Sequence, residues 1–295
     1  MNRRRRIGRK LSLRKHHRIN SRSRARRNDE GDRDSQGSTP IRADFFAHDE
    51  SVCRMVAVSS RILSLNLRHG GGSRANLLID WIASKAPFVA VLTEWRENAS
   101  GRLIKDGLTR AGLSSVCAPR GPKINTALLA SRDLTRCEIF TPTNSPVGDL
   151  ALMTIDGINI LGCYFPQRKA KGPFFKRCMD AAAEASHSPL LAIGDFNTGR
   201  NDLDIEGTGT RFDCADQFIA LHEQAGLIDL WRFRHGERRE WTWRSPKNGF
   251  RIDHAFGNQA FINRFPTYRC EIDHEPRLLG LTDHSAIVID LDNRS

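Results

Sequence analysis

The segment from Leu190 to Asn197 constrains the fold of this chain more than any other. Residues 190–193 are apolar, and Gly194, Asp195, Phe196 and Asn197 follow. A short apolar run that ends at a glycine is typical of a strand buried in a sheet that is covered on both faces. Because side chains alternate along a strand, we expect Asp195 and Asn197 to point one way and Phe196 the other. Taken alone, the segment predicts either a polar pair that serves chemistry or an Asx turn that ends a strand.

Expected strands and helices follow one another along the chain from Ser59 onward. The expected strands are residues 61–67, 88–94, 125–131, 151–155, 158–164 and 286–291. The expected helices are residues 73–85, 102–112, 174–185 and 211–224. Ser73 should cap the first helix, whose buried face should comprise Leu77, Leu78, Trp81 and Ile82. We also expect a hairpin of residues 241–244 and 251–256 around the turn residues 246–249. This order predicts a layered α/β arrangement.

Polar side chains stand at the ends of these expected strands. They are Asn66, Glu94, Tyr164, Asp195 with Asn197, and Asp283 with His284, and Asp253 joins them from the expected hairpin. One such residue is ordinary at a strand end. Because strand ends on one side of a sheet converge in space, the repetition predicts a shared site.

Six motifs in order carry a resemblance to a known superfamily. They are Leu65-Asn66, Leu92-Thr93-Glu94, Tyr164-Phe165-Pro166, Gly194-Asp195-Phe196-Asn197, Arg251-Ile252-Asp253 and Thr282-Asp283-His284-Ser285. Together they resemble the endonuclease/exonuclease/phosphatase superfamily of DNase I, exonuclease III and the AP endonucleases, over roughly residues 59–292. The resemblance implies an α/β (α+β) fold: a four-layer, DNase I-like sandwich of two mixed sheets flanked by helices. We expect this domain to span residues 41–295.

The resemblance also implies a metal site. Glu94 matches the main metal ligand, with Asn66 adjacent and Asp283 as a further candidate. Carboxylate and amide oxygens suit Mg²⁺, and we expect Mn²⁺ to be able to substitute for it.

The remaining matched residues have implied catalytic roles. Asp195 fits the base that activates water, and Asn197 fits a donor to a phosphoryl oxygen. His284 matches a histidine that pairs with an acid, here Asp253, which would favour the imidazolium form. Tyr164 matches a tyrosine that contacts phosphate. Phosphodiester hydrolysis needs such a base and such neutralising groups.

Structural alternatives stand beside these roles. Glu94 could be a solvated acid at a strand end, Tyr164 a core tyrosine and His284 a plain loop histidine. Catalytic roles are not expected for His69, in a glycine-rich loop, or for His254, which should face away from Asp253. Trp241 and Trp243 are expected to be core or hairpin aromatics rather than surfaces for stacking bases.

The chain also departs from the AP endonuclease pattern. Arg68 stands where those enzymes carry an acid, and Gln167 where they carry asparagine. Residues 112–149 match no motif. These differences weigh against abasic-site specificity more than against hydrolysis.

The basic charge of the chain is concentrated near its start. Residues 1–40 hold 14 of the 46 Lys and Arg and 4 of the 34 Asp and Glu, so +10 of the net +12 lies there. Residues 1–27 lack acids, and we expect a disordered arm followed by a linker to residue 40. The arm, including Arg3, Arg4, Arg5 and Arg6, predicts phosphate contacts, although an uninformative extension or a targeting segment has the same composition. Because the rest is nearly neutral, bulk charge does not argue for nucleic-acid binding by the domain.

Cysteine usage and hydropathy suggest where the protein resides. Seven scattered cysteines without a Cys-x-x-Cys pair predict reduced thiols, a cytoplasmic location and no zinc site. No apolar run approaches the roughly 20 residues of a membrane helix, and we expect no membrane span and a monomer.

Three functions follow as hypotheses. The first is a Mg²⁺-dependent phosphodiester hydrolase, a nuclease that acts on DNA rather than RNA. The second is a phosphatase or phosphodiesterase of the same fold that acts on a small or lipid phosphate ester. The third is a catalytically inactive nucleic-acid-binding module.

Overall fold

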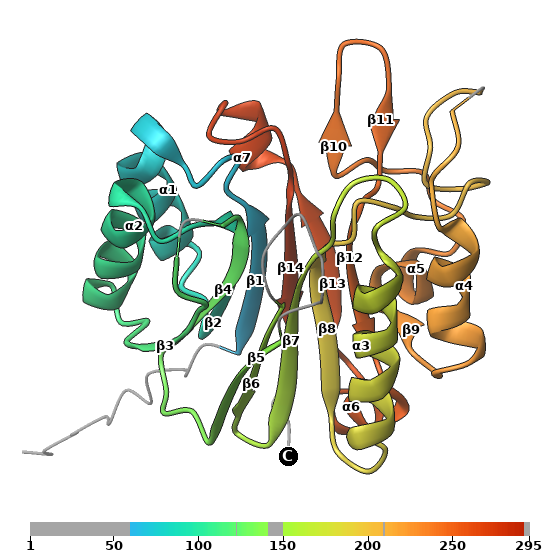
Figure 1. Ribbon diagram of the computed structural model, residues 1–295, viewed down its shortest axis with the longest axis horizontal. Helices are drawn as coiled ribbons and strands as arrows, with labels where there is room; N and C mark the ends of the chain where they lie inside the picture. Colours follow the sequence, from blue (N-terminus) through green and yellow to red (C-terminus); the bar gives the residue numbers. More distant parts are fainter. Residues whose placement is uncertain (1–59, 122, 141–149, 209, 292–295) are drawn as a thin grey trace, which may run out of the picture. The chain divides into compact units, whose positions relative to one another are not determined.

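Two mixed β-sheets form the centre of the described part of the protein (Figure 1). The computed structural model describes residues 60–121, 123–140, 150–208 and 210–291. The predicted arm and linker, with Arg3 to Arg6, lie outside these ranges. Among the described residues, no helix is both long and apolar enough to cross a bilayer.

The first sheet joins strands from the start and the end of the domain. Its order is β13 (Arg269–Asp273), β14 (Ala286–Asp290), β1 (Arg61–Asn66), β2 (Val89–Trp95), β4 (Asn125–Ala130) and β3 (Ser115–Cys117). Strands β1 and β2 are parallel, and the other neighbours are antiparallel.

The second sheet contains the strand that the Leu190–Asn197 segment predicts. Its order is β5 (Arg136–Phe140), β6 (Leu150–Ile155), β7 (Ile158–Tyr164), β8 (Leu190–Asp195), β12 (Asp253–Gly257) and β9 (Ile228–Asp229). Strands β7 and β8 are parallel, and the other neighbours are antiparallel.

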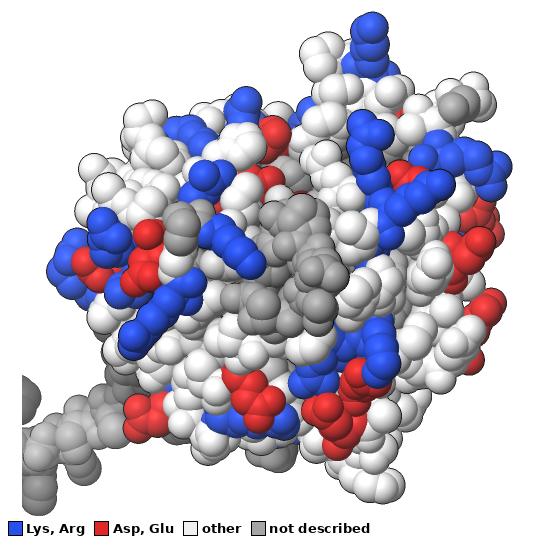
Figure 2. All heavy atoms as spheres, viewed as in Figure 1, with Lys and Arg blue, Asp and Glu red and all other residues white. Residues whose placement is uncertain are grey.

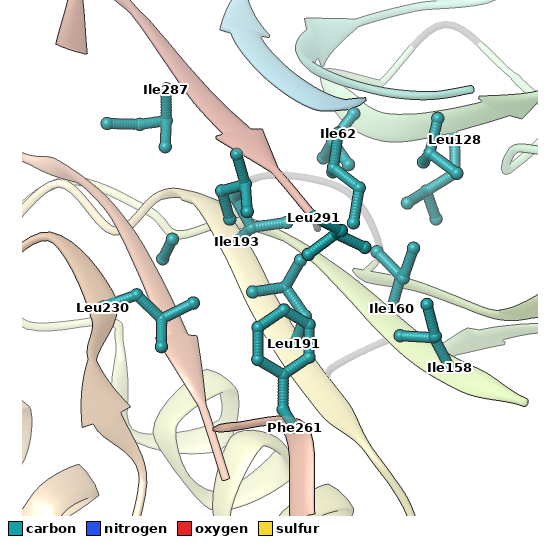
Figure 3. Close-up of a cluster of buried hydrophobic side chains, with 14 of the residues drawn as sticks. Ile62, Leu128, Ile158, Ile160, Leu191, Ile193, Leu230, Phe261, Ile287 and Leu291 are labelled. Carbon is teal, nitrogen blue, oxygen red and sulfur yellow. The ribbon is translucent and has the colours of Figure 1, made fainter. Parts of the chain in front are cut away.

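An apolar core fills the space between the two sheets (Figure 3). Ile62 and Leu128 enter it from the first sheet, and Ile160, Leu191 and Ile193 enter it from the second; all five are fully buried. Burial of each such side chain stabilises the fold by about 1.5–3 kcal/mol relative to exposure. This core fixes the two sheets face to face, and it therefore fixes the strand ends that carry the polar motifs.

Helices form the two outer layers. Helices α1 (Ala75–Ser84) and α2 (Ala99–Arg110) pack on the first sheet, and α3 (Gly172–Glu184) and α4 (Ala215–Glu223) pack on the second (Figure 1). The predicted four-layer fold is confirmed. The shorter helices are η1 (Gly72–Arg74), α5 (Leu230–His235), α6 (Gln259–Arg264) and α7 (Glu275–Leu278).

Two local expectations about the first helix are wrong. Helix α1 begins at Ala75, after the 3-10 turn η1, and no side chain caps it. Leu77 is 57% exposed, whereas Leu78, Trp81 and Ile82 are buried. Because helix α2 and the sheet cover only one stripe of α1, the neighbouring Leu77 lies just outside that stripe.

The prediction that residues 251–256 form the second strand of a hairpin is also wrong. The short hairpin consists of β10 (Trp243–Arg244) and β11 (Gly249–Phe250). The following strand β12 instead pairs with β8, with Asp253 opposite Asp195. Every residue of β12 is buried, which fits a central strand and not an exposed hairpin.

The expectation that all cysteines are reduced is wrong for one pair. Cys117 in β3 and Cys137 in β5 form a disulfide, with Cα atoms 5.6 Å apart. Their strands occupy edges of different sheets, in the region that matched no motif, so spacing in the sequence could not reveal the pair. Cys163, Cys178, Cys214 and Cys270 are free thiols.

Candidate active site

Asp195 lies at the centre of the candidate site, at the end of β8. Its side chain is 1% exposed. Oδ1 accepts the Asn197 backbone N–H at 2.8 Å, and Oδ2 accepts Asn66 Nδ2 at 2.9 Å. Phe196 is buried among the aromatic rings of the outer face, 4.7 Å from Phe165 between centroids. The strand therefore places Asp195 and Phe196 on opposite faces, as alternation predicts.

The amide of Asn197 is already engaged. Asn197 adopts the left-handed conformation with φ of 49°, which asparagine tolerates better than most residues. Its Nδ2 donates to Phe165 O at 2.8 Å and lies 3.3 Å from Asp195 Oδ2. In this arrangement Asn197 orients Asp195, and a donation to a phosphoryl oxygen requires one of these contacts to be exchanged.

Asp253 and His284 form a buried pair beside Asp195. Asp253 Oδ2 lies 2.8 Å from His284 Nδ1, and the side chains are 4% and 6% exposed. Because Nδ1 faces a carboxylate, it carries the proton in this pair. The second ring nitrogen of His284 makes no hydrogen bond within the described residues and remains the one that could reach a ligand.

Thr242 holds this pair in place, and the sequence analysis missed it. Its Oγ1 accepts the backbone N–H groups of Ile252 and Asp253 at 3.0 and 3.1 Å. Its carbonyl oxygen accepts the N–H of Ser285 at 2.7 Å. One buried threonine thus joins the backbone before Asp253 to the backbone after His284. No pattern in the sequence distinguishes it from other threonines.

The charges of this cluster shift its proton affinities. Burial, and then the neighbouring Asp253, raise the pKa of Asp195 to about 8. Burial lowers the pKa of His284, but the charge and hydrogen bond of Asp253 outweigh it and bring that pKa to about 10. His284 is therefore an imidazolium at neutral pH, and the carboxyl group of Asp195 loses its proton only at a higher pH than an ordinary aspartate.

Glu94 and Tyr164 meet at the ends of β2 and β7. Strand β2 changes register between Leu92 and Trp95, and Glu94 within this bulge has φ of 54°. Such a conformation re-aims a side chain. Glu94 Oε2 accepts the His69 backbone N–H at 2.5 Å, and Oε1 lies 3.4 Å from the Tyr164 hydroxyl. Burial, and then the charge of Glu94, raise the pKa of Tyr164, so its hydroxyl stays protonated.

The two halves of the site are connected, and the eight residues predicted for catalysis and metal binding lie in one region. Asn66 bridges to Asp195, and the charge of Glu94 contributes to the raised pKa of Asp195. Asp283 lies at the rim, where its Oδ2 accepts Trp243 Nε1 at 3.2 Å. His69 approaches more closely than expected, with Nδ1 3.5 Å from Glu94 Oε2.

Two sets of side chains could hold a metal ion. Asp195, Asp253 and His284 offer ligand atoms within 4.8 Å of one another. In that set, however, an ion would have to displace a proton from the His284 imidazolium, which the buried Asp253 carboxylate stabilises. The Glu94 side chain is 15% exposed, and its Oε1 makes only one long contact, with the Tyr164 hydroxyl at 3.4 Å. Asn66 Oδ1, which accepts the Arg68 backbone N–H at 2.8 Å, is a further oxygen of the kind that a hard cation prefers. Glu94 and Asn66 therefore suit an ion without deprotonation of His284.

His254 lies away from the candidate residues, and the two tryptophans belong to the hairpin region, although Trp243 also borders the site through its hydrogen bond to Asp283. His254 Nε2 lies 2.8 Å from Thr198 O, on the opposite side of β12 from Asp253. Trp243 is a hairpin aromatic whose ring lies 5.8 Å from Phe250. Trp241 packs against Gly249, where any side chain would collide with its ring.

A buried ion network supports the strand that carries Asp253. Arg251 is fully buried, with Nε 2.7 Å from Asp204 Oδ1 and a terminal nitrogen 2.7 Å from Asp229 Oδ2. Arg232 adds a contact of 2.5 Å to Asp204. The sequence analysis quoted Arg251 in a motif but gave no role to it or to its partners.

Comparisons with known proteins agree with this architecture. The model of the Endonuclease/Exonuclease/phosphatase family matches residues 63–284, and the chain belongs to that family. Family membership supports a phosphoester hydrolase.

Solved structures share the fold at low sequence identity. A 3' phosphatase, NExo from Neisseria, bound to a product DNA hairpin, is 20% identical with a TM-score of 0.66, over 79% of this chain and 100% of that one. A 3'-5' exonuclease, NExo from Neisseria meningitidis, is 21% identical with a TM-score of 0.64, over 79% and 99%. An AP endonuclease from Archaeoglobus fulgidus is 18% identical with a TM-score of 0.61, over 79% and 99%.

Proposed function

We propose that the protein is a Mg²⁺-dependent nuclease that hydrolyses phosphodiester bonds in DNA. The observation that carries this proposal is the placement of Asp195 between the Asp253–His284 pair on one side and Asn66 with Glu94 on the other. A base, an imidazolium and a carboxylate then lie close enough for the charges of His284 and Glu94 to act on Asp195. Each group matches a requirement of attack by water on a phosphoester.

The roles follow from the hydrogen bonds. Asp195, held by Asn66 and Asn197, takes the proton of the attacking water when its carboxylate is ionised. His284, kept protonated by Asp253, donates to a phosphoryl oxygen and offsets the charge that develops there. The protonated Tyr164 hydroxyl is a second donor.

A divalent cation would be held by Glu94 and Asn66, with Asp283 at the rim. When bound, it supplies Lewis-acid polarisation of a phosphoryl oxygen. Mg²⁺ suits this all-oxygen set, and Mn²⁺ would accept the same ligands.

The surface around the site supports a nucleic acid as substrate. Basic residues follow the ends of the strands that carry the site, and they include Arg68, Arg96, Arg168 and Arg200. Figure 2 shows Lys and Arg side chains along the upper part of the viewed face, beside the hairpin β10–β11, with carboxylates among them. One relative of the same fold is a phosphatase bound to a DNA product. We further propose that the arm with Arg3 to Arg6 adds salt-sensitive phosphate contacts.

A substrate panel tests this proposal. Plasmid, abasic duplex, single-stranded DNA, RNA and an inositol phosphate are incubated with Mg²⁺, Mn²⁺ or EDTA. We expect DNA to be hydrolysed with either metal and not with EDTA, and Glu94→Gln to lose activity by about 10²-fold or more. Hydrolysis of the inositol phosphate alone would instead support a small-ester phosphatase, and DNA binding without hydrolysis would support an inactive binding module.

A further inference from the structure

A second histidine–carboxylate pair is bonded to the residue that follows His284. His274 Nε2 lies 2.8 Å from Glu240 Oε1, and His274 Nδ1 lies 2.8 Å from Ser285 Oγ. Because Nε2 faces a carboxylate, it carries the proton, and Nδ1 is left to accept the hydrogen of the Ser285 hydroxyl. The three side chains therefore form a chain of hydrogen bonds that ends beside His284.

Two arginines extend this chain at its two ends. Arg277 Nε donates to Ser285 Oγ at 3.1 Å, and a terminal nitrogen of Arg277 lies 3.3 Å from His274 Nδ1. Arg238 lies 2.9 Å from Glu240 Oε2. These guanidinium groups only donate, so they favour the arrangement in which Nδ1 and both carboxylate oxygens accept. Each member of the chain thus has a partner at each end, which is the condition for a polar network to hold one geometry.

The chain joins segments that are far apart in the sequence. His274 lies between β13 and α7, and Glu240 precedes the hairpin β10–β11 (Figure 1). Ser285 precedes β14 and is 1% exposed. The N–H of Ser285 also donates to Thr242 O at 2.7 Å. Both the backbone and the side chain of Ser285 are therefore held by other parts of the fold.

The position of Ser285 determines where the backbone of His284 lies. His284 forms an isolated antiparallel bridge with Trp243, so this segment is extended. Side chains alternate in extended backbone, and Ser285 consequently points away from the side on which His284 meets Asp253. The Asp253 contact fixes one ring nitrogen, and the anchored serine fixes the peptide that carries the ring.

We propose that the Glu240–His274–Ser285 chain positions His284, so that its second ring nitrogen is aimed at a phosphoryl oxygen of the substrate. The inference rests on the proposed function and adds three positioning residues to it. These residues act on the reaction only through the backbone of His284. Supporting contacts of this kind hold a catalytic group within about 0.5 Å of its productive geometry, and a misplacement of about 1 Å can lower a rate about 10²-fold.

The test measures kcat and KM for metal-dependent DNA hydrolysis in variants of the whole chain. We expect Ser285→Ala and His274→Ala each to lower kcat about 10-fold or more and to leave KM nearly unchanged. Glu240→Gln keeps an acceptor for the His274 N–H and should retain most of the activity, whereas Glu240→Ala should not. Urea denaturation of each variant gives the folded fraction, so that kcat is compared per folded molecule.

A double-mutant cycle tests whether the chain acts through His284. In a His284→Asn protein, assayed with enzyme in excess over substrate, the further change His274→Ala should lower the remaining rate by less than about 2-fold. His187→Ala is the matched control, because His187 is an exposed histidine in the loop before β8. It should leave kcat and KM unchanged.

Two results would overturn this inference while the proposed function stands. One is an unchanged kcat in folded Ser285→Ala and His274→Ala proteins. The other is an equal loss from His274→Ala with and without His284→Asn. Hydrolysis of no DNA substrate by the wild-type protein would overturn the proposed function, and the inference with it.

Discussion

Two buried charge clusters lie on either side of Ile252, and they differ in how their charges are balanced. On one side, Arg251 is enclosed by Asp204 and Asp229 at 2.7 Å each. On the other, Asp253 forms a hydrogen bond with His284, and the charge of Asp195 also acts on that imidazole. Burial opposes ionisation of Asp229, but Arg251 outweighs it and lowers the pKa of Asp229. The pKa of Asp195 is instead raised to about 8, by burial first and Asp253 next.

Under the proposed function, the difference separates a structural cluster from one that takes part in the reaction. In the Arg251 cluster, each carboxylate faces a guanidinium, so both clearly prefer the charged form. In the Asp195 cluster, two carboxylates share one imidazolium, and one of them is left with a high proton affinity. A carboxylate of that kind is suited to accept a proton near neutral pH. The imbalance is therefore the property that we connect with catalysis.

Removal of Arg251 should give the largest loss of stability. Arg251→Met keeps much of the side-chain volume but leaves Asp204 and Asp229 buried without their cation. We expect the free energy of unfolding to fall by about 3–5 kcal/mol, as measured by urea denaturation. Arg244→Met is the control, since the exposed pair of Arg244 and Glu206 should contribute only about 0–1 kcal/mol. Equal losses in both variants would show that the buried network is not special.

The two clusters should also respond to pH in opposite directions, with a smaller effect. The pKa of Asp229 is below its ordinary 3.8, so its contribution to stability is present above that value and lost as the pH falls below it. The pKa of His284 is about 10, above its ordinary 6.5, so its contribution is full below 6.5 and lost as the pH rises through 10. Asp195 acts in the same direction as His284. Because its pKa is raised from 3.8 to about 8, its contribution to stability is present below pH 3.8 and is lost as the pH rises through 8.

Urea denaturation with EDTA across these pH ranges checks this prediction. We expect a decline on the alkaline side that is smaller in His284→Asn than in the wild-type protein. An unchanged alkaline decline in that variant would contradict the assignment of the raised pKa to His284.

The sequence predicts the parts of this site that depend on strand ends. The apolar run before Asp195 and the polar residues after other strands suffice to place Asn66, Glu94 and Tyr164 near one another, because the sheets impose that geometry. The order strand, helix, strand near the start of the domain indicates a layered α/β fold, and the resemblance of the motifs indicates the four layers.

The sequence does not predict contacts that only the folded chain creates. Thr242 supports Asp253 through backbone N–H groups, and Asp204 reaches Arg251 across a loop. Neither residue type nor spacing marks these contacts. The pairing of β12 with β8 was missed because the turn residues 246–249, between two short expected strands, also fit a hairpin. Long-range pairing depends on burial that the local pattern does not encode.

The most direct test of this account measures activity and stability together in Asp195→Asn and Asp229→Asn. Each substitution removes one buried carboxylate charge at nearly constant size. We predict that Asp195→Asn lowers metal-dependent DNA hydrolysis by about 10²- to 10⁴-fold and changes the free energy of unfolding by less than about 1 kcal/mol. Asp229→Asn should lower that free energy by about 3–5 kcal/mol and retain the activity per folded molecule. An active Asp195→Asn protein, or the same loss of activity and stability in both variants, would contradict the account.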